Sequence, residues 1–149
     1  MKKNAFSLLE IIITLSIISV LVMISTSGYY GLQKGSRDAK RKADIDIIRN
    51  ALELYKLNNF RYPKSLDKLT GDKKYLQSIP QDPYSNQEYG YNATAVSTDC
   101  NDLIDETSVY CTNYILGAYL ERSTTNNCEI AMSCGSKLCN YCTDPYGKK

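Results

Sequence analysis

The chain has 149 residues, a formal net charge of +2, 43% hydrophobic residues and 23% charged residues. This composition fits one ordinary folded domain and excludes a disordered tail or a polytopic membrane protein, and the charge is too small to indicate nucleic-acid binding by itself. Histidine is absent, which excludes hydrolases with a Ser-His-Asp or Cys-His site and catalytic zinc bound by histidine.

The first 33 residues are apolar and almost uncharged. Lys2, Lys3 and Glu10 carry the only charged side chains before Lys34. The uncharged run is long enough to supply the roughly 20 residues that a helix needs to span a bilayer. We therefore expect a short leader over residues 1–5 and a transmembrane helix over residues 6–33.

The order of features at the N-terminus differs from that of an ordinary secretory signal. In such a signal the cleavage site follows the apolar core, whereas here the small residue Ala5 precedes it. Met1 to Ala5, followed by FSLLEIIITLSII, resembles the prepilin signal of type IV pilins and type II secretion pseudopilins, although the family usually carries glycine at the position of Ala5. This resemblance implies cleavage between Ala5 and Phe6, N-methylation of Phe6, and a role for Glu10 in filament assembly.

An ionised Glu10 at the start of an apolar helix costs free energy unless a positive charge pairs with it. In filaments of the family, the free N-terminal amine of a neighbouring subunit supplies that charge. The alternative is a carboxylate that reaches the membrane interface in a plain signal anchor.

The helix is expected to continue as an amphipathic segment over residues 34–60. Apolar residues recur there at helical spacing on one face, with charged residues on the other. The apolar positions are Ile47, Ile48, Ala51, Leu52 and Tyr55, and the charged positions are Lys42, Asp46, Arg49, Glu53 and Lys56. Because the apolar stripe needs a surface to pack on, we expect it to dock on a globular head formed by residues 61–149.

Strand-like segments are expected in the head over residues 88–93 and 108–121, which are rich in β-branched and aromatic residues. The predicted fold class is α+β. A long N-terminal helix, half membrane-embedded and half amphipathic, packs on a small antiparallel sheet with a Cys-rich C-terminal region, as in a type IV pilin-like lollipop.

The resemblance extends over roughly the first three-fifths of the chain. AKRKADIDIIRNALELYKLNNFRYP is similar to the helix that docks on the head of the major pseudopilin of type II secretion, and YLQSIPQDPYSNQEYGY is similar to the passage that follows it. The remainder departs from the family, which typically ends in an acidic, glycine-rich calcium loop. The acidic residues Asp99, Asp102, Asp105 and Glu106 lack the glycines of such a loop, so no metal site is predicted.

All six cysteines lie in the head from residue 100 onward: Cys100, Cys111, Cys128, Cys134, Cys139 and Cys142. An even number in an exported domain predicts three disulfides, whose pairing the spacing does not rank. The alternative is a zinc site of Cys128, Cys134 and the C-x-x-C pair Cys139 and Cys142.

The expected function is that of a structural subunit, a pilin or pseudopilin, that polymerises into a type IV pilus or a type II secretion-like filament after leader cleavage and N-methylation. No catalytic residue and no cofactor is expected. The resemblance implies a homo-oligomeric helical filament, related minor pilins, a prepilin peptidase and an inner-membrane assembly platform as partners.

The same resemblance implies a single pass through the cytoplasmic membrane with the N-terminus in the cytoplasm, followed by an extracytoplasmic filament. Two alternatives remain open. One is a competence-type pseudopilin that takes up DNA, and the other is a signal-anchored monomeric binding protein with a disulfide-stapled head.

Overall fold

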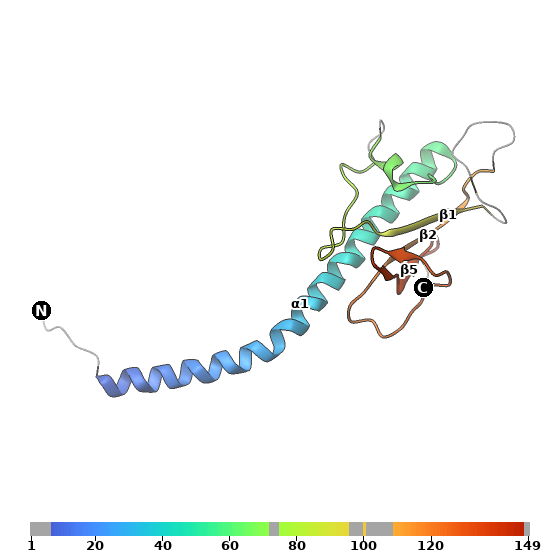
Figure 1. Ribbon diagram of the computed structural model, residues 1–149. Coiled ribbons are helices and arrows are strands. Elements are labelled where there is room, and N and C mark those ends of the chain that lie inside the picture. Colours follow the sequence, from blue (N-terminus) through green and yellow to red (C-terminus); the bar gives the residue numbers. More distant parts are fainter. Residues whose placement is uncertain (1–6, 72–74, 96–99, 101–108, 148–149) are drawn as a thin grey trace, which may run out of the picture. The chain divides into compact units, whose positions relative to one another are not determined.

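The structure is a computed structural model that describes residues 7–71, 75–95, 100 and 109–147 (Figure 1). The chain divides into two compact units, Met1–Ser36 and Arg37–Lys149, and each is described by itself. The elements are one helix, α1 (Leu8–Asn59), a 3₁₀ turn (Leu66–Leu69), and the strands β1 (Gly90–Thr94), β2 (Asn113–Ala118), β3 (Ser133–Cys134), β4 (Lys137–Leu138) and β5 (Tyr141–Thr143).

Ser7 caps the start of α1. Its hydroxyl oxygen accepts a hydrogen bond from the Leu9 N–H at 3.4 Å, and its carbonyl accepts from the N–H groups of Glu10 and Ile11. A serine in this position satisfies N–H groups that have no partner within the helix. The described helix begins at Leu8, and Glu10 lies in its first turn.

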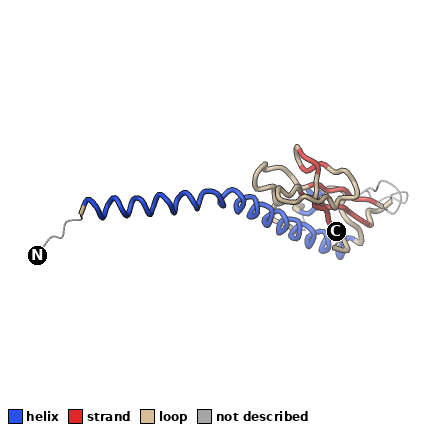
Figure 2. Tube along the Cα trace, turned by 90° about the horizontal axis from the view of Figure 1, so that it is seen from below, coloured by secondary structure: helices blue, strands red, loops and turns tan. Residues whose placement is uncertain are grey.

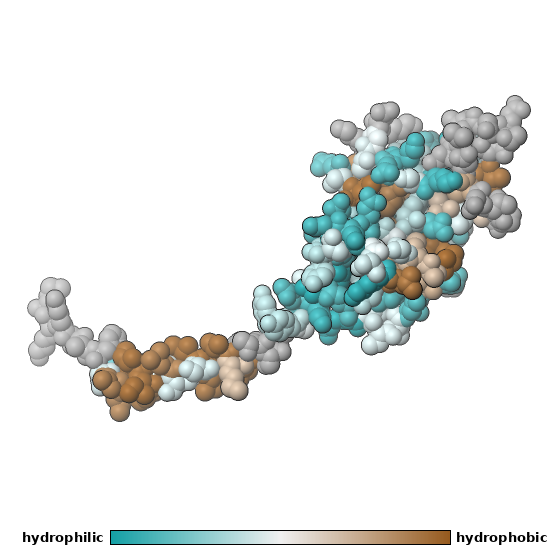
Figure 3. Space-filling view, viewed as in Figure 1, coloured by the Kyte–Doolittle hydropathy of each residue, from teal (hydrophilic) through white to brown (hydrophobic). Residues whose placement is uncertain are grey.

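The N-terminal unit presents apolar side chains on every side of the helix. Leu8, Leu15 and Met23 are 77%, 58% and 78% exposed, and their neighbours between them are similar. Figure 3 shows this part of α1 as an almost uniformly hydrophobic surface. Among the described residues, no single helix is long and apolar enough to span a membrane. Taken together, Leu8–Ile24 and Tyr29–Asn59 are long and apolar enough by length and composition.

In the second unit, the C-terminal half of α1 lies along a three-stranded sheet (Figure 2). Ile45, Ile48 and Leu52 are fully buried against Tyr62 and the β2 residues Tyr114 and Leu116 in one core. The predicted stripe is thus largely correct, but Ile47 is 46% exposed and Ile45 takes the buried position instead. The buried face continues toward the N-terminus through charged side chains, described below.

The sheet has the order β1-β2-β5, and both pairings are antiparallel. Both predicted strands exist but are shorter than expected. Glu88 forms an isolated bridge with Gln81, and β1 begins only at Gly90. β2 ends at Ala118, because the side chain of Asn140 then hydrogen-bonds the backbone of Leu120 in place of a neighbouring strand. The Asn140 side-chain oxygen accepts from the Leu120 N–H at 2.7 Å, and the Asn140 side-chain NH₂ donates to the Leu120 carbonyl at 2.9 Å.

Three disulfides stabilise the head, as predicted. The pairs are Cys100–Cys111, Cys128–Cys142 and Cys134–Cys139. The two cysteines of the C-x-x-C motif therefore belong to different disulfides, and the four cysteines of the alternative zinc site are all oxidised. No cluster of three or more metal-binding side chains occurs in the described part of the chain. The acidic residues from Asp99 to Glu106 considered for calcium lie outside it.

Candidate assembly site

Glu10 is an isolated carboxylate on an apolar helix. In the described part of the N-terminal unit, the only other charged residue is Lys34, which follows it by 24 positions (34 − 10 = 24). At ~1.5 Å per residue this is roughly 36 Å along the helix. The first turn of α1 favours a negative charge because the N–H groups there are unpaired. Among the described residues of this unit, no cation is therefore close enough to neutralise Glu10.

The other polar side chains of this segment are satisfied within the helix. The hydroxyl groups of Thr14, Ser16 and Ser19 donate to the carbonyls of Ile11, Ile12 and Leu15 at 2.9, 2.8 and 2.7 Å. Hydroxyls bonded in this way are tolerated in an apolar environment, where water supplies no partner. Glu10 is thus the polar group of Leu8–Ile24 that requires a partner from outside the segment.

The two predicted processing residues, Ala5 and Phe6, lie outside the described residues. Their roles therefore remain predictions. Glu10 is placed by the structure in the first turn of α1, three residues after Ser7.

A buried ion cluster fastens α1 to the head in the second unit. The Arg41 side chain is only 3% exposed and donates to three carboxylates: Asp38 at 2.8 Å, Glu121 at 2.9 Å and Asp82. Arg37 adds a two-pronged pair to Glu121 at 2.7 and 2.6 Å. The cluster joins the helix, the loop before β1 and the segment after β2.

Asp38 also connects α1 to the segment after β2. Its two carboxylate oxygens accept the backbone N–H groups of Glu121 and Arg122, each at 2.9 Å. Hydrogen bonds to Arg37 lower the pKa of Glu121 to about 2, against a smaller opposing effect of burial. Burial opposes the shift at Asp82, but hydrogen bonds from Arg41 and from the N–H groups of Ser85 and Tyr84 outweigh it and lower its pKa.

Two tyrosines extend the attachment of the helix along its buried face. The Tyr89 hydroxyl donates to Asp44 at 2.7 Å and the Tyr62 hydroxyl donates to Glu53 at 2.9 Å. Burial, followed by these hydrogen bonds, raises the pKa of both phenols. The cluster and these bonds show that many of the charged side chains of residues 37–53 are paired with groups of the head.

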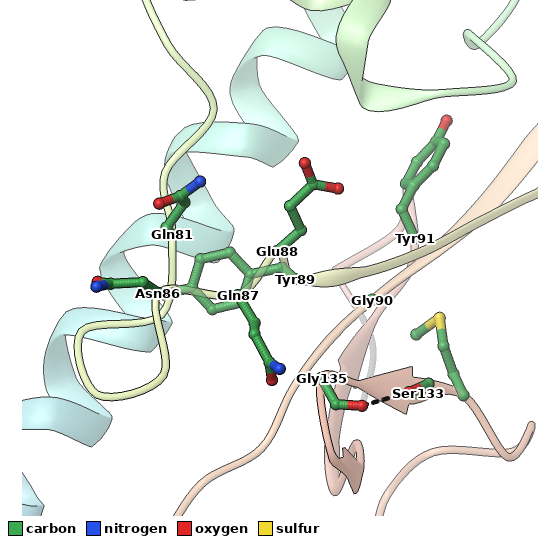
Figure 4. A pocket seen from close by; sticks show the side chains of 10 residues that line it. Gln81, Asn86, Gln87, Glu88, Tyr89, Gly90, Tyr91, Ser133 and Gly135 are labelled. Atoms are coloured by element: carbon green, nitrogen blue, oxygen red, sulfur yellow. Dashed lines mark hydrogen bonds between the residues drawn. The ribbon is translucent and has the colours of Figure 1, made fainter.

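The head also has an open depression of about 690 Å³ between the approach to β1 and the β3–β4 hairpin (Figure 4). Its lining includes the amide side chains of Gln81, Asn86 and Gln87. The Ser133 hydroxyl donates to the Gly135 carbonyl at 2.8 Å, and the Gln87 side-chain oxygen accepts the Ser136 N–H at 3.1 Å. Among the lining residues, Glu88 supplies the only carboxylate.

Comparison with known proteins agrees with this arrangement. A family model described as "Type II secretion system (T2SS), protein G" matches residues 29–106, and one described as "Prokaryotic N-terminal methylation motif" matches residues 1–26. The first match ends before most of the disulfide-bonded region. No solved structure matches the chain.

Curated relatives share the same name. The chain is 30% identical to type II secretion system core protein G of Aeromonas hydrophila over 100 residues, which cover 57% of this chain and 70% of the relative. For the protein of that name from Escherichia coli K12 the values are 30%, 57% and 69%, and for that from Vibrio cholerae they are 28%, 60% and 70%. These matches, with the apolar helix and the pilin-like α+β head, show that the chain belongs to the type II secretion system protein G family.

Proposed function

We propose that this protein is a filament-forming pseudopilin of a type II secretion-like system and has a structural role rather than an enzymatic one. The observation that carries the proposal is the apolar helix Leu8–Ile24, exposed on every side and bearing one carboxylate. A helix that is apolar all round requires a non-aqueous cover. A bilayer supplies it before assembly, and the same segments of neighbouring copies supply it in a filament.

Maturation is proposed to begin with cleavage between Ala5 and Phe6, followed by methylation of the new amine of Phe6. The match of residues 1–26 to the N-terminal methylation motif supports this step. Cleavage here creates a positive charge four residues before Glu10. It also retains the whole apolar helix on the mature chain.

Glu10 is proposed to pair with the N-terminal amine of a neighbouring copy. Support comes from the isolation of Glu10, whose own unit holds no nearer described cation than Lys34. Bringing an amine and a carboxylate together removes two uncompensated charges from an apolar surrounding. The proposed partners are other pseudopilins, a prepilin peptidase and an inner-membrane assembly platform. The proposed topology has the N-terminus in the cytoplasm and the head outside.

N-terminal mass spectrometry of the membrane-extracted protein tests the processing step. The expected N-terminus is N-methylated Phe6. A mature chain that begins at Met1, or one that begins beyond residue 24, would contradict the proposal.

Substitution of Glu10 tests the assembly step. Glu10→Ala is expected to remain in the membrane fraction, because the change makes the segment more apolar, and to yield few filaments in sheared surface material. Glu88→Ala, which removes an exposed carboxylate of the head, is the matched control and should assemble normally. Normal filament yield from Glu10→Ala would exclude the pairing role.

A further inference from the structure

Phe60 directly follows α1 and has a backbone conformation that bulky residues rarely adopt. Its φ is 58°, in the left-handed region that glycine and asparagine tolerate best. This conformation closes the helix, because the Phe60 N–H donates to the Lys56 carbonyl at 2.7 Å. A glycine would make the same bond without the steric cost. Helix termination therefore does not explain a phenylalanine at this position.

The Phe60 side chain gains no burial in the head that would offset this cost. It is 91% exposed, and Leu57, three residues earlier, is 73% exposed. A strained backbone at an exposed aromatic residue indicates a role in binding rather than in folding. The partner has to cover an apolar side chain that stands out from the surface of the head.

Arg61, the next residue, supplies a cation. Its guanidinium lies over the ring of Tyr110, 5.0 Å from the centroid, and no carboxylate of the described residues forms a salt bridge with it. The nearby Lys56 is used within the head, where its ammonium donates to the Tyr62 hydroxyl at 3.2 Å. We call the following group the helix-end patch: Leu57, Phe60, Arg61, Val109 and Tyr110.

The amide side chains beside Phe60 already have partners within the head. The side-chain NH₂ of Asn58 donates to the Leu54 carbonyl at 3.1 Å. That of Asn59 donates to the Tyr75 hydroxyl, also at 3.1 Å. Because donors bonded within the protein do not need water, this end of the helix can enter a surrounding with little water at a lower cost.

We propose that the helix-end patch binds an anionic lipid surface, with Phe60 inserted at the boundary between headgroups and acyl chains and Arg61 paired with a lipid phosphate. Apolar and aromatic side chains beside a cation are typical of interfacial anchors. A fluid interface accepts a protruding side chain without a matching pocket. The patch is also small, whereas a stable protein interface takes roughly 20–30 residues on each side. These features favour a lipid surface over a protein partner.

Vesicle flotation of the full-length chain tests this proposal. The chain is held by its N-terminal helix in nanodiscs of phosphatidylcholine, and vesicles of phosphatidylcholine, alone or mixed with an equal part of phosphatidylglycerol, are added. The wild type is expected to float with the mixed vesicles about fivefold more than with the neutral ones.

Substitutions of Phe60 assign the binding to the patch. Phe60→Gly is expected to lower flotation with the mixed vesicles about tenfold, because it removes the inserted side chain, whereas Phe60→Trp should retain it. Leu138→Ser removes an apolar side chain that is 63% exposed elsewhere on the head. It is the matched control and should float like the wild type.

Thermal unfolding separates the loss of binding from a loss of folding. Glycine fits the left-handed backbone and Phe60 has little packing to lose. Phe60→Gly is therefore expected to unfold at the wild-type temperature or above it. A fall of more than about 4 °C would show that Phe60 stabilises the head, and would overturn the proposal.

The remaining outcomes are equally decisive. A wild-type chain that floats with neither kind of vesicle, a Phe60→Gly variant that floats normally, or an equal loss from Leu138→Ser would each overturn the proposal. A photoreactive amino acid in place of Phe60 is expected to yield lipid adducts of the full-length chain in cells. Crosslinks to a protein, without a lipid adduct, would show that the patch is a protein-binding site instead.

Discussion

Gly90 on β1 and Gly117 on β2 lie directly opposite each other in the antiparallel ladder, and the disulfide-bonded C-terminal segment rests on both. A Cβ atom at Gly90 would lie 2.8 Å from Sγ of Cys139, and one at Gly117 would lie 2.7 Å from Cε of Met132 and 3.0 Å from Sγ of Cys142. At this pair, neither strand places a side chain on the sheet. Two disulfides, Cys134–Cys139 and Cys128–Cys142, can therefore approach its backbone.

Substitution of these glycines should destabilise the head unequally. Gly90→Ala also meets the backbone carbonyl of Ser133 at 2.9 Å, so we expect it to lower the free energy of unfolding by about 1–3 kcal/mol, as for an overpacked core. Gly117→Ala should cost less, because the end of the Met132 side chain can rotate away. Urea unfolding of the detergent-solubilised protein measures both.

Gly71→Ala is the control for this comparison. Its new Cβ would meet only the Lys68 carbonyl at 3.6 Å, an ordinary contact, and its stability should stay within about 0.5 kcal/mol of the wild type. Equal stability of Gly90→Ala and Gly71→Ala would show that the C-terminal segment does not rest on β1.

Removal of Arg41 should be among the most damaging changes in the head. Arg41→Met leaves Asp38 and Asp82 without their cationic partner in a largely buried cluster, which is expected to cost about 3–5 kcal/mol. Arg41→Lys keeps the charge but not the planar fork that binds several carboxylates, and should recover only part of the loss. A result in which the two variants are equally stable would show that the geometry of the guanidinium is unimportant.

Acid should weaken the head through the same cluster. The folded pKa of Glu121 is lowered from 4.5 to about 2, so its contribution is fully present above its unfolded pKa. It is lost as the pH falls from about 5 toward 2. Glu121→Gln should therefore reduce the slope of unfolding free energy against pH in this range, whereas Glu88→Gln, an exposed control, should not. Parallel slopes for wild type and Glu121→Gln would contradict the assignment.

The disulfide pairing makes a direct chemical prediction. Alkylation without reduction should modify none of the six cysteines, and a digest without reduction should contain linked peptides for Cys128–Cys142 and Cys134–Cys139. Loss of Cys100–Cys111, which closes a loop of 11 residues, is expected to cost about 2–3 kcal/mol in the double serine variant. Alkylation of four cysteines only after treatment with a chelator would instead indicate zinc.

Several features follow from local residue patterns alone. The N-terminus is one such feature. A short basic leader that ends at Ala5, followed by an apolar run with Glu10, indicates a prepilin-type N-terminus. This does not depend on the fold of the head, because insertion into a bilayer depends on the composition of the segment itself. Helical spacing identified Ile48, Ala51 and Leu52 as buried, because neighbouring turns of a helix place these residues on one face. The even number of cysteines indicated oxidation without indicating partners.

Contacts between distant parts of the chain decided the rest. Arg41 lies in a basic run of the sequence, between Lys40 and Lys42, which by itself indicates an exposed position. It is buried because Asp82 and Glu121, 41 and 80 residues away in the sequence, supply carboxylates that pair with it. Ile47 and Ile45 are equally apolar, and only the position of the sheet decides that Ile45 is buried and Ile47 is exposed. Gly90 and Gly117 acquire their role only when β1 pairs with β2 and the disulfides cover them. In each case the energy of a residue depends on desolvation and on partners that no local spacing specifies.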